Sequence, residues 1–276
     1  MDLDNIIIPP ISAVSFQVIK FDPESEAADS QALERIVTPD EGVCSEILRV
    51  SNSSFYGRSG RVKSLKDAIT LIGLKATRNL IILLSTKAMN AGLKGETFTR
   101  HLNEFSVTCA LVASELCDRL NLKQYKEEAF ISALLHKIGM TVFALNKRRE
   151  YADLLRKVET EFADLAEEER KRYRIDHVEL GQKLMQRWHL PDQYLDVIAH
   201  HNFKPEETGQ VSDLVRITAL ASITGREMMG ILLPMNELNR RASLVDYYGA
   251  QDWISSYDEK YFAKLREHSF YKVAVG

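Results

Sequence analysis

The chain has 276 residues, of which 45% are hydrophobic and 27% are charged, and its formal net charge is −3. This length allows one large domain or two modest ones with a substantial core, and the slightly negative charge gives no general attraction to nucleic acid or to an anionic membrane. The longest aliphatic run, residues 80–84, is far shorter than the roughly 20 residues that span a bilayer. With no targeting segment at the start and only three cysteines, we expect a cytoplasmic protein in a reducing compartment.

In the first third of the chain, apolar residues recur with the 3.6-residue period of amphipathic helices. Ser64, followed by Asp67, is similar to a capping box that opens one of these helices, and Gly73 is expected to end it. No stretch alternates apolar and polar residues as a half-buried strand does, so the expected fold class is all-α. The helices predicted here lie at about residues 11–18, 33–37, 43–50, 65–72 and 75–89.

Gly92, Gly95 and their polar neighbours mark the clearest break before residue 100. Longer helical patterns follow it, at about residues 101–121, 125–145, 148–171, 176–189, 192–201, 211–230 and, more weakly, up to 268. We therefore predict an N-terminal helical lobe at 1–92 and a second lobe at 93–230 that together act as one module, followed by a C-terminal helical extension at 231–276. The densely charged segment 161–174 favours a solvated helix face or connector over a binding patch.

Four of the seven histidines fall where they could carry chemistry. His136 lies in an apolar helical pattern, His177 opens a helix, and His200 and His201 close another. Adjacent residues on a helix point about 100° apart, so His200 and His201 cannot both face one site squarely. Their spacing alone gives little support for a shared metal site, and a hydrogen-bonded core histidine is the commoner outcome for a residue like His136.

The segment Asn52-Ser53-Ser54-Phe55-Tyr56-Gly57 has two interpretations. It could be a recognition loop that presents polar groups and an aromatic ring, with Asn52, Ser53, Phe55 and Tyr56 as a candidate interaction segment. The structural alternative is favoured, because Asn and Ser compete for the backbone at a helix end and Gly readily takes a left-handed turn there.

Several short segments, in this order, resemble the HD superfamily of metal phosphohydrolases and, more narrowly, the HDOD domain. The superfamily segments are the ALLHKIG sequence at 133–139, the H-x-E-x-G sequence at 177–181, the W-x-L-P sequence at 188–191 and the I-A-H-H sequence at 198–201. The HDOD resemblance rests on the N-terminal sequences at 9–11, 48–53, 55–57 and 64–74. Over residues 5–225, the resemblance implies a multi-helix HDOD fold, with a helical lobe packed on an HD-like lobe, and a bacterial signalling module.

The resemblance also implies where a catalytic HD site would hold its metal ligands, and this sequence departs from the pattern at three positions. Phe105 stands at the first histidine, Lys137 at the aspartate of the His-Asp pair, and Ser222 at the closing aspartate. Mg²⁺, Mn²⁺ or Fe²⁺ needs anionic oxygen ligands beside imidazole, and without a metal no water is activated near neutral pH. We therefore expect no catalytic residue, metal or cofactor at the remnant positions Phe105, His136, Lys137, His177, His200, His201 and Ser222.

The sequence thus predicts a non-catalytic regulatory or interaction module in bacterial signal transduction, which binds a protein partner or a small ligand. The alternative is a metal-dependent HD-type phosphohydrolase, or a cyclic-dinucleotide phosphodiesterase, with a rearranged site. Nucleic acid and membrane are not expected as partners, and the oligomeric state stays open. For Lys137 two orientations are expected equally: inward, where its ammonium replaces the metal and donates to His136, or outward to solvent.

Overall fold

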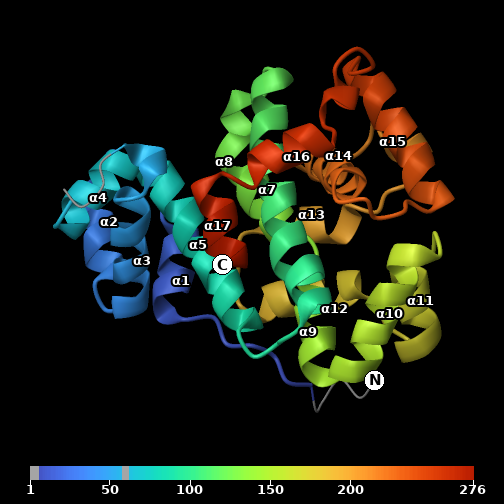
Figure 1. Cartoon of the computed structure of the whole chain (residues 1–276), viewed down its shortest axis with the longest axis horizontal. Coiled ribbons are helices and arrows are strands. Elements are labelled where there is room, and N and C mark those ends of the chain that lie inside the picture. The colour runs from blue at the N-terminus through green and yellow to red at the C-terminus, as the bar shows by residue number, and fades with distance from the viewer. Residues whose placement is uncertain (1–5, 58–61) are drawn as a thin grey trace.

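The computed structural model describes residues 6–57 and 62–276, and their regular secondary structure is entirely helical. This confirms the all-α class. The four helices at the N-terminal end gather on one side of the molecule, at the left of Figure 1, and α5 leads away from them toward the rest of the chain. Their bounds are α1 Ala13–Lys20, α2 Ser30–Val37, α3 Glu41–Ser51, α4 Leu65–Ile72 and α5 Leu74–Asn90.

The ends of these helices follow the sequence closely. The Ser64 side chain accepts from the backbone N–H of Asp67 at 3.1 Å, as the capping box predicted. Gly73 ends α4 with φ +91°, a backbone conformation that favours glycine. Asp29 and Asp40 cap α2 and α3 in the same way as Ser64 caps α4, so each helix start is fixed by its own side chain.

The remaining helices form the larger body at the right of Figure 1. They are α6 Glu96–Phe98, the π-helical turn η3 Thr99–Glu104, α7 Phe105–Arg119, α8 Lys126–Leu135, α9 Gly139–Asn146, α10 Arg148–Thr160, α11 Leu165–Tyr173, α12 His177–Arg187, α13 Asp192–His200, α14 Asp213–Met228, α15 Met235–Tyr248, α16 Glu259–Leu265 and α17 Ser269–Val275. Two long predicted helices are each divided in two, at 136–138 and at 161–164. The second break has a local cause, since Asp164 caps the new helix by accepting from the N–H of Glu167 at 2.8 Å.

Contacts of Arg78 and of the C-terminal helix tie the N-terminal helices to the larger body. The buried guanidinium of Arg78 on α5 donates to the carbonyl oxygens of Val18 and Ile19 at the end of α1, and to the hydroxyl of Tyr194 on α13. The C-terminal helix α17 packs against α5, η3 and α7, and the chain ends between α5 and α7 (Figure 1). A hydrogen bond of 2.7 Å from Lys87 Nζ to the carbonyl oxygen of Val273 fixes that helix.

The most apolar helical stretch lies in the centre of this body. Residues Lys123–Asn146 are long and apolar enough to cross a membrane, but 83% of their most apolar window is buried inside the fold. A core helix gives the same signal. The bent pair α4 and α5, whose axes meet at 107°, passes the same test of length and composition when taken together.

A buried histidine cluster as the candidate functional site

Close backbone packing between α9 and α12 creates the site. A Cβ atom added to Gly139 would lie only 2.0 Å from the carbonyl oxygen of His177, and one added to Gly181 would lie 3.0 Å from Cγ2 of Ile198. Only glycine allows two helices to approach this closely. The contact brings His136, which lies just before α9, next to His177 at the start of α12.

Three imidazole rings meet there. His136, His177 and His201 are each at most 2% exposed. The ring centroids of His136 and His201 are 5.1 Å apart, and those of His177 and His201 are 5.8 Å apart. The three side chains come from the turn after α8, the start of α12 and the end of α13, so the cluster holds these elements together.

The hydrogen bonds of the rings fix their tautomers. Nδ1 of His136 lies 2.6 Å from the carbonyl oxygen of Ala133, and Nδ1 of His201 lies 3.0 Å from that of Ile198. A carbonyl oxygen only accepts, so each Nδ1 carries the hydrogen and each neutral ring presents the lone pair of Nε2. The lone pair of His136 is used, because Ser222 Oγ lies 3.0 Å from its Nε2 and donates to it.

His177 is held by a carboxylate that the sequence did not point to. Glu169 on α11 is fully buried, and its Oε2 accepts from Nδ1 of His177 at 2.6 Å and from the backbone N–H of His177 at 2.7 Å. Its Oε1 accepts from the hydroxyl of Tyr151 at 2.5 Å. The expectation that segment 161–174 is only a solvated face is therefore wrong at this position, because Glu169 points into the core. The Nε2 atoms of His177 and His201 have no hydrogen-bond partner in the described part of the chain.

Burial keeps two of the rings neutral. Removal from water lowers the pKa of His136 and of His201 well below the ordinary value, and the charge of Lys137 lowers both further. A buried imidazolium would have no carboxylate partner here, since Glu169 bonds only to His177 and Tyr151. Neutral rings agree with the tautomers that the carbonyl contacts require.

The three positions at which the sequence departs from the HD pattern all lie at this cluster. The buried ring of Phe105 has its centroid 5.9 Å from that of His136, and Ser222 bonds to His136 as described. Lys137 takes the inward orientation, but the described contacts include no hydrogen bond from its ammonium to His136. Its ammonium lies 5.1 Å from the centroid of Phe105 and lines a cavity of about 20 Å³, a volume that holds about one water molecule. Burial lowers the pKa of Lys137, and the charge of Glu237 partly offsets that effect.

His200 lies outside the cluster. Its side chain is 58% exposed, and its Nδ1 donates to Oδ1 of Asp196 at 2.8 Å. Of the two neighbouring histidines, which the sequence indicated could not both face one site, His201 faces the cluster and His200 points to solvent. The helical rotation of about 100° between neighbouring residues turns one of the pair outward.

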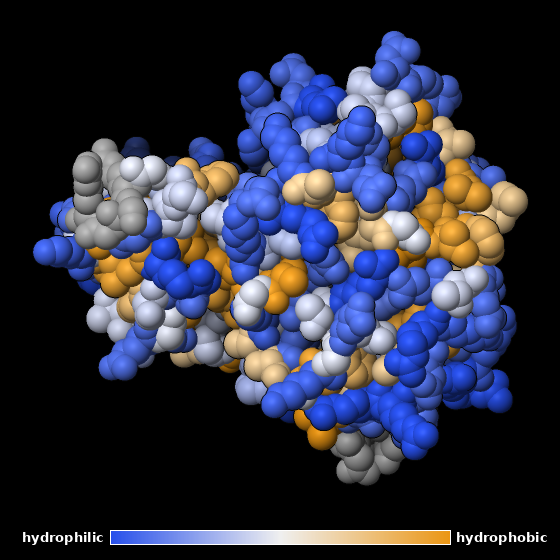
Figure 2. Space-filling model, viewed as in Figure 1, coloured by the Kyte–Doolittle hydropathy of each residue, from blue (hydrophilic) through white to orange (hydrophobic). Residues whose placement is uncertain are grey.

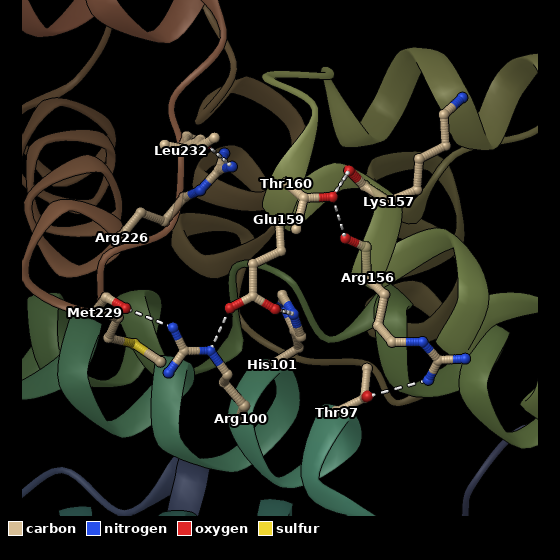
Figure 3. Close-up of polar contacts among 10 residues, drawn as sticks. All are labelled: Thr97, Arg100, His101, Arg156, Lys157, Glu159, Thr160, Arg226, Met229 and Leu232. Carbon is tan, nitrogen blue, oxygen red and sulfur yellow. Dashed lines mark hydrogen bonds and ion pairs between the residues drawn. The ribbon is translucent and has the colours of Figure 1, made fainter.

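An ion network borders the small cavity and includes a histidine that the sequence analysis missed. Oε1 of Glu159 lies 2.5 Å from Nε of Arg100, and its Oε2 lies 3.2 Å from Nε2 of His101 (Figure 3). The hydrogen bond from His101, with that from Arg100, lowers the pKa of Glu159 to about 2. Arg100 also donates to the carbonyl oxygen of Met229 at the end of α14 (Figure 3). The network thereby fastens the π-helical turn that precedes Phe105 to α10 and α14.

The candidate interaction segment is divided between two roles. Asn52 donates to the carbonyl oxygens of Leu48 and Val62 and accepts from the N–H of Val62, and Ser53 Oγ donates to the carbonyl oxygen of Val50 at 2.7 Å. These two side chains therefore hold the loop in shape. The loop aromatics differ in exposure: Tyr56 is partly buried, whereas Phe55 is 53% exposed with its ring centroid 4.8 Å from that of His268.

The residues of the cluster do not fit a metal ion of the HD type. Among residues 6–57 and 62–276, no group of three or more His, Cys, Asp or Glu side chains is arranged to hold a metal. Glu169 is occupied by His177 and Tyr151. The cations of Lys137 and Arg226 line the adjacent cavity, where a divalent ion would meet repulsion rather than carboxylate ligands.

The fold and this site define an all-helical protein with a cluster of three buried histidines. The HDOD domain family model matches residues 8–203, and the chain belongs to the HDOD family. An uncharacterized protein of Treponema pallidum (strain Nichols) is 24% identical over 256 residues, which is 90% of this chain and 47% of that protein. This chain therefore spans about half the length of the curated relative that it matches.

Solved structures share the fold. An HDOD domain protein of unknown function from Geobacter sulfurreducens superposes with a TM-score of 0.72 at 15% identity, covering 96% of this chain and 95% of its own. A candidate phosphohydrolase of Shewanella amazonensis SB2B gives 0.71 at 20% identity, covering 98% and 95%. A candidate signal transduction protein of Marinobacter aquaeolei VT8 gives 0.71 at 19% identity, covering 97% and 59%. At these identities the likeness concerns the fold.

Proposed function

We propose that this chain is a non-catalytic regulatory or interaction module in bacterial signal transduction, which works in the cytoplasm by binding a protein partner. The single observation that carries the proposal is the hydrogen bond of 3.0 Å between Ser222 Oγ and His136 Nε2. The imidazole lone pair that a metal would need is used by a neutral side chain of the protein itself. The description of a structural relative as a candidate signal transduction protein supports the same class of function.

The chemistry of hydrolysis supports this proposal. Cleavage of a phosphodiester at neutral pH needs a metal that lowers the pKa of a bound water. Here the aspartate that would bind such a metal is replaced by Lys137, and the closing carboxylate is replaced by Ser222. The buried ring of Phe105 fills part of the remaining space beside His136.

A second candidate function is a metal-dependent phosphohydrolase, and one observation favours it. Nε2 of His177 and Nε2 of His201 are buried without a described hydrogen-bond partner, and unused imidazole nitrogens are metal ligands in other proteins. Two imidazole nitrogens without a carboxylate ligand are a weak site for Mg²⁺ or Mn²⁺. The non-catalytic function is therefore preferred.

Elemental analysis and a hydrolysis assay separate the two. The purified full chain should contain well below one transition metal per molecule, and it should not hydrolyse a model phosphodiester or a cyclic dinucleotide with Mn²⁺, Mg²⁺ or Fe²⁺ present. The variant Lys137→Asp should stay inactive too, because Phe105 and Ser222 still supply no ligand. About one bound metal per chain that is lost in His136→Ala, or metal-dependent hydrolysis by the wild-type chain, would contradict the proposal.

A further inference from the structure

Three large apolar side chains stand exposed where α11 and α15 begin. Phe162 is 60% exposed, Met235 is 68% exposed and Leu238 is 40% exposed. A hydrogen bond of 2.7 Å from Asn236 Nδ2 to Asp164 Oδ2 joins the two segments, so these side chains share one neighbourhood. Figure 2 shows hydrophobic surface gathered over the start of α15 and the adjoining loop between α10 and α11. We call Phe162, Met235 and Leu238 the apolar patch.

The backbone at Phe162 shows that packing does not account for this patch. Phe162 has φ +53°, a left-handed conformation that is unfavourable for a bulky residue. The ring gains little burial in return, since most of its surface faces solvent. Met235 and Leu238 lie three residues apart and therefore on one face of the first turn of α15. Exposed apolar groups that are clustered in this way mark interaction sites more often than scattered ones do.

An acidic cleft opens directly beside the patch. Its volume is about 710 Å³, and Asp164 and Asn236, which join the two segments of the patch, both line it. Five carboxylates face this cleft against two guanidinium groups; the carboxylates belong to Asp164, Glu167, Asp176, Asp196 and Glu207, and the guanidinium groups to Arg170 and Arg240.

The two arginines are already engaged within the protein. Arg170 forms an ion pair with Asp176, and Arg240 donates to the backbone carbonyl oxygens of Phe203 and Asn202. The exposed carboxylate of Glu167 has its nearest described cation, Lys171, at 3.9 Å. Because the five carboxylates outnumber the two guanidinium groups of the lining, an excess of negative charge faces the cleft, beside an apolar surface.

We propose that the patch and the cleft together dock a basic amphipathic helix of a partner protein. This inference rests on the proposed function and identifies the chemistry of its partner. The apolar face of the helix covers Phe162, Met235 and Leu238, and its Lys or Arg side chains enter the cleft toward Glu167. Charge complementarity selects this occupant, since an acidic segment or a nucleic acid would be repelled by the carboxylates.

A second copy of this chain is a poorer occupant for the same reason. In a two-fold symmetric contact the same surface meets itself, so each acidic cleft would face its own equivalent. Like charges placed opposite each other oppose such an interface. A helix in a groove also suits the arrangement of the patch, because anchors three or four residues apart on the partner would match an apolar surface of this kind.

The test uses the purified full chain and a synthetic 18-residue helical peptide of Leu and Lys with a 3.6-residue apolar period as the probe. Fluorescence anisotropy should show saturable binding that weakens with added salt. Met235→Asp and Glu167→Lys should each weaken it at least about tenfold, which equals 1.4 kcal/mol. Ile7→Asp, at another exposed apolar position, is a matched control that should retain the wild-type affinity.

Phe162→Gly separates binding from folding. Glycine relieves the left-handed strain, so the thermal midpoint should stay within a few degrees of the wild type while peptide affinity falls about tenfold. The inference is overturned if the peptide fails to bind, if a matched Leu and Glu peptide binds as well, or if the patch variants bind normally. A dimer in sedimentation that Met235→Asp dissociates would also overturn it. None of these results concerns metal or hydrolysis, so failure here is distinguishable from failure of the proposed function.

Discussion

Removing the hydroxyl of Ser222 tests whether its hydrogen bond to His136 stabilises the histidine cluster. In Ser222→Ala, Nε2 of His136 loses its donor at 3.0 Å while the ring stays buried at 1% exposure. A buried polar atom left without a partner costs about 1–3 kcal/mol. For a chain of 276 residues, with an unfolding entropy of roughly 2.1 cal/mol/K per residue, this corresponds to a decrease in Tm of about 2–5 °C.

Ser132→Ala is the matched control. Ser132 lies on α8, is 1% exposed, and its hydroxyl has no hydrogen-bond partner in the described ranges. Both variants remove one buried oxygen from a serine in a helix, so they differ mainly in whether a hydrogen bond is lost. Removal of an unpaired hydroxyl should leave stability unchanged or slightly raised, within about 0.5 kcal/mol.

The assay is thermal and urea unfolding followed by far-ultraviolet circular dichroism, at pH 7.5, where His136 is neutral. If Ser222→Ala costs no more than Ser132→Ala, the contact between Ser222 and His136 contributes nothing. The Ser222 hydroxyl would then not be satisfying the Nε2 lone pair of His136.

Two further stability changes follow from the charges around the cluster. Lys137→Met should raise stability near pH 7 by more than the roughly 0.5 kcal/mol of an ordinary surface substitution. Because burial lowers the pKa of Lys137, wild-type stability rises as alkaline pH neutralises the ammonium, and urea titrations should show the gain shrinking there. Glu159→Gln should lower stability at pH 7 by about 1–3 kcal/mol. This is less than the full lowering of the Glu159 pKa implies, because the side chain is 24% exposed to solvent. The pKa of Glu159 is lowered from 4.5 to about 2, so this contribution exists above pH 4.5 and the difference should vanish as pH falls toward 2.

Much of the fold follows from local sequence signals. Ser64 and Gly73 bound α4 as predicted, because caps and left-handed glycines act within a few residues. The helix breaks at 136–138 and 161–164 could not be predicted from the sequence, because the apolar periodicity continues across both of them. The first break places Gly139 against the backbone of α12. No local sequence pattern encodes such a long-range contact.

From the sequence, the positions of candidate site residues could be predicted, but not which of their side chains meet in space. The family pattern indicated His136, His177 and the pair His200 and His201, but only the helical rotation in three dimensions decides that His201 faces inward. The role of the Glu169 carboxylate could not be predicted from the sequence, for a different reason. Glu169 lies in a run of residues of mixed charge, which is typical of a solvent-exposed helix face. Only its contact with His177 across a helix break shows that it is buried.

The histidine cluster and the proposed docking surface rest on the same helix. Asp164 immediately precedes α11, and its carboxylate caps this helix and accepts a hydrogen bond from Asn236 of α15 at the apolar patch. Five residues later the same helix supplies Glu169, which holds His177 in the cluster. A rigid helix between the two contacts means that a change in the position of α11 alters both. The hydrogen bond between Glu169 and His177 therefore links the position of α11 to the histidine cluster, and the hydrogen bond between Asp164 and Asn236 links it to the apolar patch.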